Sequence, residues 1–154
     1  MEKLKFYQYF LEGLEFAFNN PNNLQFKQAF EDLYKRIEWQ HICEDWGIVN
    51  AQKDEQGLIK VNGNVDFAYS ALLELPLNFS EVTGNFDIAY SAIRNLKGCP
   101  KHIGGNFDIV ECKLNDLSKF PEHICGDMHA YGNYFGLTEE QIREHVKVDG
   151  VIYL

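Results

Sequence analysis

The 154-residue sequence lacks any apolar run that approaches the ~20 residues needed to cross a membrane as a helix. It also lacks a basic segment, because 14 Lys and Arg stand against 23 Asp and Glu, giving a formal net charge of −9. The phosphates of a nucleic acid repel such a chain at long range. Direct nucleic-acid binding and membrane insertion are therefore disfavoured, whereas a partner protein with a basic surface is favoured.

Cysteine is scarce, and none of the cysteines forms a CxxC pair. The first residues lack a basic region followed by an uninterrupted apolar run, because Gln8, Glu12 and Glu15 interrupt it. We therefore expect free thiols in a reducing cytoplasm. The four cysteines are Cys43, Cys99, Cys112 and Cys125.

Recognisable catalytic motifs are absent as well. There is no GxSxG, no phosphate-cradling glycine loop and no Cys/His pair in a familiar context, so we predict that the protein is not an enzyme and uses no cofactor. His123, Cys125 and His129 lie within seven residues, and stacked repeats could bring Cys99 and His102 alongside. Their spacing matches no closed zinc pattern, which predicts that no metal binds.

Residues 1–57 are predicted to form an N-terminal helical cap and a connecting loop. Leu4, Tyr7, Leu11, Leu14 and Phe18 recur at helical spacing, and a second apolar stripe runs from Leu24 to about Cys43. Gly47 follows as a helix-ending residue. The two helices should form a hairpin. Its many aromatic residues pack on the first repeat or, alternatively, form a second contact surface or a homodimer interface.

Residues 58–135 repeat with a period of 21. Aligning Val61, Val82, Ile103 and Ile124 also aligns four glycines, and such a period is typical of a solenoid. The glycines are Gly63, Gly84, Gly105 and Gly126. Each unit continues with Asn or Asp and a short alternating segment, in which Phe86 and Ile88 should point inward while Asn85 and Asp87 point to the other side.

The repeat resembles the strand-and-turn core of leucine-rich repeats. In that core, apolar residues flank a position held by Asn or Cys, and Phe86, Ile88, Ser91 and Ile93 occupy the corresponding places in order. Cys112 and Asn133 take the Asn-or-Cys position itself and should satisfy backbone groups where each strand ends. With Pro100 and Pro121 late in their units, the variant is similar to short repeat proteins common in bacteriophages and bacteria. The resemblance implies a solenoid and a binding role.

Residues 136–154 should close the stack with a helix and a strand. Thr138 and Gln141 have the spacing of a capping box, and residues 148–153 repeat the start of the first unit, predicting an edge strand. The predicted fold class is therefore an α+β solenoid, in which an N-terminal helical hairpin caps a short leucine-rich-repeat-like parallel sheet and a helix and strand cap its C-terminal end.

Stacking the strands would align side chains in rows on the outward face, with neighbours about 4.8 Å apart. An acidic row of Asp66, Asp87 and Asp108 ends at His129, and a parallel row holds Asn64 with three further polar residues. Apolar and tyrosine side chains lie beside the acidic row and suit a protein contact. The aspartates could receive Lys or Arg from a partner, or instead bond to the backbone or the asparagines. The remaining predicted partner-binding residues are Asn85, Asn106, Asp127, Tyr69, Tyr90, Glu111 and Tyr131.

These features favour a non-catalytic module that binds a basic protein. The phage-like repeats suggest an inhibitor of a host defence nuclease, similar to an anti-CRISPR protein, acting in the host cytoplasm. A structural or self-assembling repeat protein is the alternative, and an enzyme with an unrecognised metal site is the third.

Overall fold

The computed structural model describes residues 28, 38–114, 118–133, 136 and 138–154. The chain divides into two compact units, Met1–His41 and Ile42–Leu154. Most of the predicted hairpin, residues 2–18 and 24–37, lies outside the described residues. Residues 38–45 are helical and end near the predicted Cys43, and Gly47, two residues further on, has φ +64°. In the described part of the chain no helix has the length and apolarity required to traverse a bilayer.

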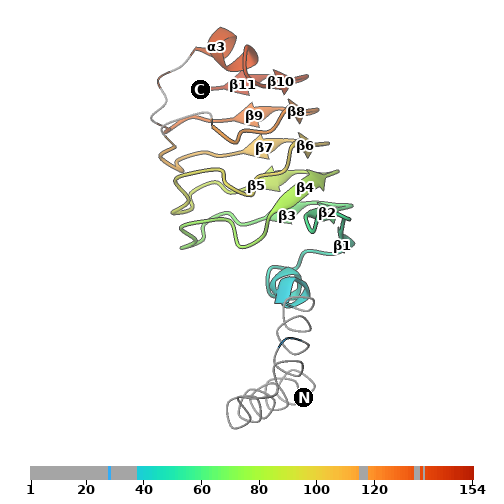
Figure 1. The fold of residues 1–154 in the computed structure, drawn as a ribbon. Coiled ribbons are helices and arrows are strands. Elements are labelled where there is room, and N and C mark those ends of the chain that lie inside the picture. Colours follow the sequence, from blue (N-terminus) through green and yellow to red (C-terminus); the bar gives the residue numbers. More distant parts are fainter. Residues whose placement is uncertain (1–27, 29–37, 115–117, 134–135, 137) are drawn as a thin grey trace. The chain divides into compact units, whose positions relative to one another are not determined.

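The second unit is a parallel β-solenoid whose turns stack one on another (Figure 1). Each turn contributes one strand to each of two sheets rather than to the single sheet predicted. The difference arises because Val61, Val82, Ile103 and Ile124, which set the repeat register, end strands of their own. These strands are too short to show the alternation by which a strand is recognised in a sequence.

The first sheet has the order β1-β2-β4-β6-β8-β10. All pairs are parallel except β1 with β2, where the polar run after Asn50 forms a hairpin strand. Its strands are β1 (Ala51–Lys53), β2 (Ile59–Val61), β4 (Phe79–Val82), β6 (His102–Ile103), β8 (His123–Ile124) and β10 (Lys147–Val148).

The second sheet has the order β11-β9-β7-β5-β3 and is parallel throughout. Its register places equivalent residues of successive repeats side by side, as the 21-residue period predicts. Its strands are β3 (Val65–Asp66), β5 (Phe86–Asp87), β7 (Phe107–Asp108), β9 (Met128–His129) and β11 (Ile152–Tyr153).

The core lies between the two sheets and is built from the inward residues of every turn. Phe86 is fully buried and contacts Phe67, Phe79 and Phe107, with ring centroids 6.3, 5.4 and 6.0 Å away. Trp46 packs edge-on against Phe67 at 4.9 Å, so at least this N-terminal aromatic residue covers the first repeat. The predicted inward direction of Phe86 and Ile88 is confirmed.

The residues at the Asn-or-Cys position bond to the backbone as predicted. Asn133 Nδ2 donates to the carbonyls of Ile109 and Ala130, each at 2.8 Å, and the Cys112 thiol donates to the Ile88 carbonyl at 2.9 Å. The bonds to Ile88 and Ile109 join successive turns where the backbone leaves the second sheet, and the bond to Ala130 lies within one turn.

The predicted helix–strand cap closes the C-terminal end. Helix α3 (Glu139–Arg143) has Thr138 as its N-cap with the expected capping box to Gln141, and Ile142 is buried. Arg143 reaches past the helix and donates to the Gly150 carbonyl at 2.8 Å. Strands β10 and β11 then add one further pair to the two sheets (Figure 1).

Candidate protein-binding face

The outward face of the second sheet carries the predicted acidic row. Pairing of β3, β5 and β7 sets Asp66 beside Asp87 and Asp87 beside Asp108. The row continues to His129, and β11 adds Tyr153 next to His129. We call these five residues the acidic row, and sequence analysis missed only Tyr153. The 24-residue step from Gly126 to Gly150 was the signal, because the same step leads from His129 to Tyr153.

Each aspartate is held by a hydrogen bond within its own strand end. Oδ1 accepts the N–H two residues later, which is Ala68 for Asp66, Ala89 for Asp87 and Val110 for Asp108. The distances are 2.9, 2.9 and 3.2 Å. Such turns fix the side chain without neutralising it. The predicted backbone bonding is thus confirmed for one oxygen, and the row is a rigid line of negative charge.

Asp87, at the centre of the three carboxylates, has the least favourable electrostatic environment. Burial, foremost, and then the adjacent charges of Asp108 and Asp66 raise the pKa of Asp87, against the hydrogen bond from Ala89. Like charges on neighbouring strands are mildly destabilising. The fold therefore keeps this carboxylate at a cost in stability.

His129 ends the carboxylate part of the row. Its ring stacks on Tyr153 at 4.9 Å, and its Nδ1 is 3.6 Å from Asp108 Oδ2, too long for a hydrogen bond. This Nδ1 is buried and has no hydrogen-bond partner. The imidazole is thus positioned by stacking and leaves a polar atom unsatisfied beside the aspartates.

Tyrosines border the acidic row where the strands end. Tyr69 and Tyr90 stack with their rings 4.9 Å apart and 7° from parallel, and Tyr131 hydrogen-bonds to Tyr90. That hydrogen bond is the largest cause of the raised pKa of Tyr90. Their exposed fractions are 79%, 45% and 46%, so they form a continuous accessible aromatic patch. We call these three residues the tyrosine patch.

Two of these tyrosines adopt a backbone conformation that side chains resist. Tyr69, Tyr90 and Glu111 occupy equivalent places with φ of 53°, 54° and 54°, while the fourth repeat has Gly132 at φ 77°. Each non-glycine residue in this region costs about 1–2 kcal/mol. Strain of this kind tends to cluster at functional sites. Here it directs large side chains outward at the border of the acidic row.

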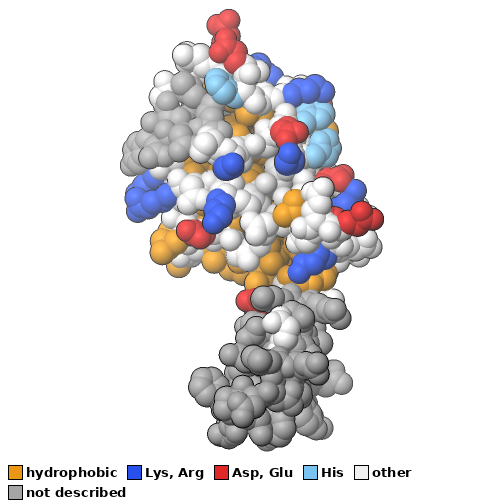
Figure 2. All heavy atoms as spheres, viewed as in Figure 1, with side chains coloured by type: hydrophobic (Ala, Val, Ile, Leu, Met, Phe, Trp, Pro, Cys, Tyr) orange, Lys and Arg blue, Asp and Glu red, His pale blue; other side chains and the backbone are white. Residues whose placement is uncertain are grey.

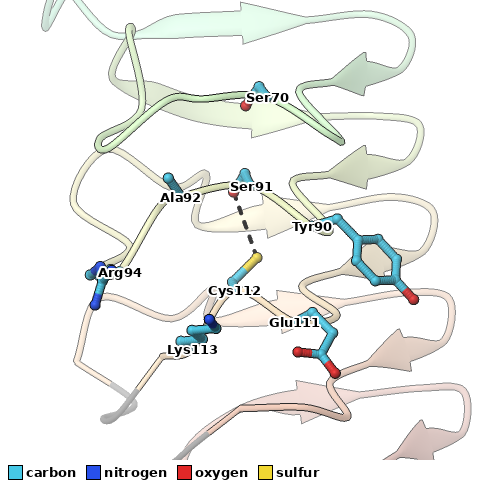
Figure 3. A pocket seen from close by; sticks show the side chains of 8 residues that line it. All are labelled: Ser70, Tyr90, Ser91, Ala92, Arg94, Glu111, Cys112 and Lys113. Carbon is cyan, nitrogen blue, oxygen red and sulfur yellow. Dashed lines mark hydrogen bonds between the residues drawn. The ribbon is translucent and has the colours of Figure 1, made fainter.

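A pocket of about 500 Å³ opens between the second and third repeats, beside Tyr90. Figure 3 shows the Tyr90 ring and the Glu111 carboxylate on one side, with Arg94 and Lys113 on the other. Ser91 and Cys112 lie at its back, 3.7 Å apart, and Ser70 Oγ is buried without a hydrogen-bond partner. The two basic residues occupy places that vary between repeats, so no periodic signal marked the pocket.

The predicted asparagine row serves the stack itself. Asn64 Oδ1 accepts the Asn85 N–H, and Asn85 Oδ1 accepts the Asn106 N–H, both at 2.9 Å. The ladder continues as Asn106 Oδ1 accepts the Asp127 N–H and Asp127 Oδ1 accepts the Val151 N–H. The ladder explains the repeated glycine, because a Cβ at Gly105 would meet Asn85 Oδ1 at 2.2 Å. We therefore assign this row a structural role.

The apolar row beside the aspartates is less accessible than expected. This row consists of Ala68, Ala89, Val110 and Tyr131. Ala89 and Val110 are 5% and 2% exposed and belong to the core, whereas Ala68 is half-buried and Tyr131 is exposed. Backbone bonds from Tyr90 and Glu111 hold the row in register, as predicted. The accessible apolar area of the face therefore comes from the tyrosine patch.

The two sheets differ in how their outward acidic residues are paired. On the first sheet, Lys60 pairs with Glu81 and Lys101 with Glu122. In the described part of the chain, no Lys or Arg forms an ion pair with Asp66, Asp87 or Asp108. Among the described residues, the three aspartates thus have no Lys or Arg partner, and His129, 3.6 Å from Asp108, is the basic side chain beside them.

Together these features define a β-solenoid repeat protein of about four turns with 21-residue spacing. No known family, curated protein or solved structure matches the chain. Its resemblance to leucine-rich repeats stays a prediction from the repeat pattern.

We expect Asp87→Asn to stabilise the protein by about 0.2–1 kcal/mol at pH 7, the range of cross-strand pair energies. Asparagine retains the Oδ1 acceptor for Ala89. Because the folded-state pKa of Asp87 is raised above 3.8, the ionised carboxylate weakens folding above that pKa. The penalty vanishes below the unfolded value. Urea unfolding at several pH values should show the stability advantage of Asp87→Asn growing as pH rises above 3.8.

Glu74→Gln, at an exposed position, is the control and should show no such pH-dependent gain in stability. An Asp87→Asn variant less stable than the wild-type protein at pH 7 would contradict the prediction.

Proposed function

We propose that the protein is a non-catalytic module that binds a partner protein with a basic surface through the acidic row and the tyrosine patch. The observation that carries the proposal is the line of Asp66, Asp87 and Asp108. Each is held by its own backbone bond, and among the described residues none has a Lys or Arg partner. Rigid charges need no reorganisation when they meet Lys or Arg, so less free energy is lost on binding.

The tyrosine patch supports the same proposal. Tyrosine supplies a large contact area with a polar tip and is enriched where binding energy concentrates. Tyr69 and Tyr90 are already stacked, so little side-chain freedom remains to be lost. A partner with basic side chains beside an apolar surface would match both parts of the face.

The finer proposal is inhibition of a host defence nuclease, in the manner of an anti-CRISPR protein. A nuclease groove built for phosphates presents closely spaced Lys and Arg, and a row of carboxylates about 4.8 Å apart could occupy it as a nucleic-acid strand does. The phage-like repeat pattern and the net charge of −9 support this proposal. We also propose that the repeats are of the leucine-rich-repeat kind. In addition, we propose that the N-terminal segment forms a helical hairpin cap whose aromatic residues mediate a homodimer.

A self-assembling repeat protein is the second candidate, favoured by one observation. Strand β11 lies at the edge of its sheet and carries the exposed Tyr153, and the exposed Val151 directly precedes it. Open sheet edges are templates for pairing with another chain. Stacking of copies through this edge would extend the solenoid.

Analytical ultracentrifugation can separate the two candidates. The purified protein is sedimented alone and with purified defence nucleases, and each nuclease is assayed for nucleic-acid binding. We expect a monomer that forms a stoichiometric complex with a nuclease and displaces its nucleic acid. A concentration-dependent homo-oligomer that leaves every nuclease unaffected would support self-assembly and refute inhibition.

A further inference from the structure

A second cluster of functional side chains lies on the first sheet, away from the acidic row. His102 on β6 and His123 on β8 are direct neighbours in the parallel register, and their ring centroids are 5.0 Å apart. Cys125 follows His123 by two residues and therefore shares its face. Figure 2 shows histidine side chains grouped at the edge of the solenoid beside acidic and basic residues.

The donor atoms of this cluster converge. Cys125 Sγ is 3.8 Å from His102 Nε2 and 3.8 Å from His123 Nε2, and the donors of all three residues lie within 4.8 Å of one another. Bond lengths of about 2.0–2.1 Å to nitrogen and 2.3 Å to sulfur place these donors about 3.6 Å apart around a tetrahedral zinc ion. The two observed sulfur–nitrogen distances of 3.8 Å are close to this value.

Asp149 supplies a carboxylate beside this cluster, because it contacts His123 from the next turn. Its N–H bonds to Ile124 O as the Cys125 N–H bonds to Ile103 O, so the two residues are equivalent on successive turns. Asp149 Oδ2 is 2.7 Å from His123 Nε2, and its Oδ1 is 3.2 Å from Lys147 Nζ. On the preceding turn the equivalent place is Gly104, so no side chain stands beside the thiol there.

We propose that His102, His123, Cys125 and Asp149 bind a zinc ion on the first sheet. Zinc bonds to both Nε2 atoms and to the Cys125 thiolate, whose proton is released to solvent. The Asp149 carboxylate exchanges its hydrogen bond with His123 for the fourth coordination position. Two neutral imidazoles, one thiolate and one carboxylate balance the charge of Zn²⁺.

The site would join three successive turns, because its ligands come from the turns of β6, β8 and β10. Structural zinc binds the folded state and so stabilises it. The sequence predicted no metal, because zinc patterns place ligands a few residues apart whereas these ligands are 21, 2 and 24 residues apart along the chain. The inference is independent of the proposed protein-binding face on the other sheet.

Titration of the chelator-treated protein with Zn²⁺ and Co²⁺ tests the site. We expect one ion per chain, a raised Tm with zinc, and a cobalt spectrum with thiolate charge-transfer absorption and the strong visible bands of tetrahedral coordination. Cys125→Ser should abolish the charge-transfer absorption although Cys43, Cys99 and Cys112 remain. His102→Gln removes a ligand and should weaken zinc binding by roughly 100-fold or more, because loss of a group that merely supports a ligand already costs about 10–100-fold.

Two further variants sharpen the test. Asp149→Asn should weaken zinc binding roughly 10-fold. His145→Gln, which alters an exposed histidine that is not a ligand of the cluster, should leave zinc binding unchanged. Circular dichroism monitors folding of each variant, and if Cys125→Ser does not fold, His102→Gln decides. Absence of zinc binding by the wild-type protein, or equal binding by His102→Gln, would overturn the proposal.

Discussion

Phe86→Ala is expected to lower the free energy of unfolding by about 3–5 kcal/mol, the usual cost of removing a fully buried phenylalanine. Phe86 has no exposed surface and contacts aromatic rings from three neighbouring segments. A domain of this size unfolds with about 5–15 kcal/mol in total. Because each solenoid turn is stabilised only by its neighbours, a cavity in the second repeat weakens both of its interfaces.

Urea unfolding followed by circular dichroism measures this loss. Phe86→Leu, which retains most of the volume, should cost less than about 1.5 kcal/mol. Leu73→Ala, which truncates an exposed apolar residue, should stay within about 0.5 kcal/mol of the wild-type protein. If Phe86→Ala matched Leu73→Ala, Phe86 could not lie at the centre of the core.

The repeat period predicted most of the solenoid from the sequence. Residues 21 positions apart have the same environment in every turn, so Phe86 and Phe107 are both fully buried and lie side by side on neighbouring strands. The capping box at Thr138 likewise marked α3, because its chemistry is local. The first sheet escaped prediction because a strand of two residues such as His102–Ile103 has no alternation to detect.

The sequence predicted part of the candidate site, namely the alignment of its residues. The period alone aligned Asp66, Asp87 and Asp108, but whether their oxygens bond to the backbone depends on strand-end geometry that no pattern encodes. The burial of Ala89 depends on packing in three dimensions. The cluster of His102 and Cys125 requires two turns to be superposed in space.

The coupling of stability and binding at Asp87 connects these observations. Burial and neighbouring charges raise its pKa, so the fold would be more stable without the charge. Selection for stability alone would replace a carboxylate of this kind. Under the proposed function, a cationic partner would relieve the repulsion between neighbours, which would account for a carboxylate at the centre of the row.

Reversing the three carboxylates of the acidic row, Asp66→Lys, Asp87→Lys and Asp108→Lys together, should weaken binding of a basic partner by more than about 100-fold. Loss of one well-paired interfacial charge costs about 2–5 kcal/mol, and each 1.4 kcal/mol is tenfold in affinity. Calorimetric titration of the partner found by ultracentrifugation measures the change. Wild-type binding should also weaken as salt is raised, because salt screens exposed charges beyond about 8–10 Å.

The matched control reverses three exposed acidic residues elsewhere, Glu55→Lys, Glu74→Lys and Glu140→Lys. It alters the net charge by the same amount, so it separates a site effect from a long-range one. We expect the control to slow association modestly while leaving dissociation close to wild type, because charges outside an interface act mainly on encounter. A folded row variant that binds nearly as tightly as the wild-type protein would place the binding site elsewhere on the molecule. Equal and large losses in both variants would instead mean that net charge, and not the aligned carboxylates, governs binding.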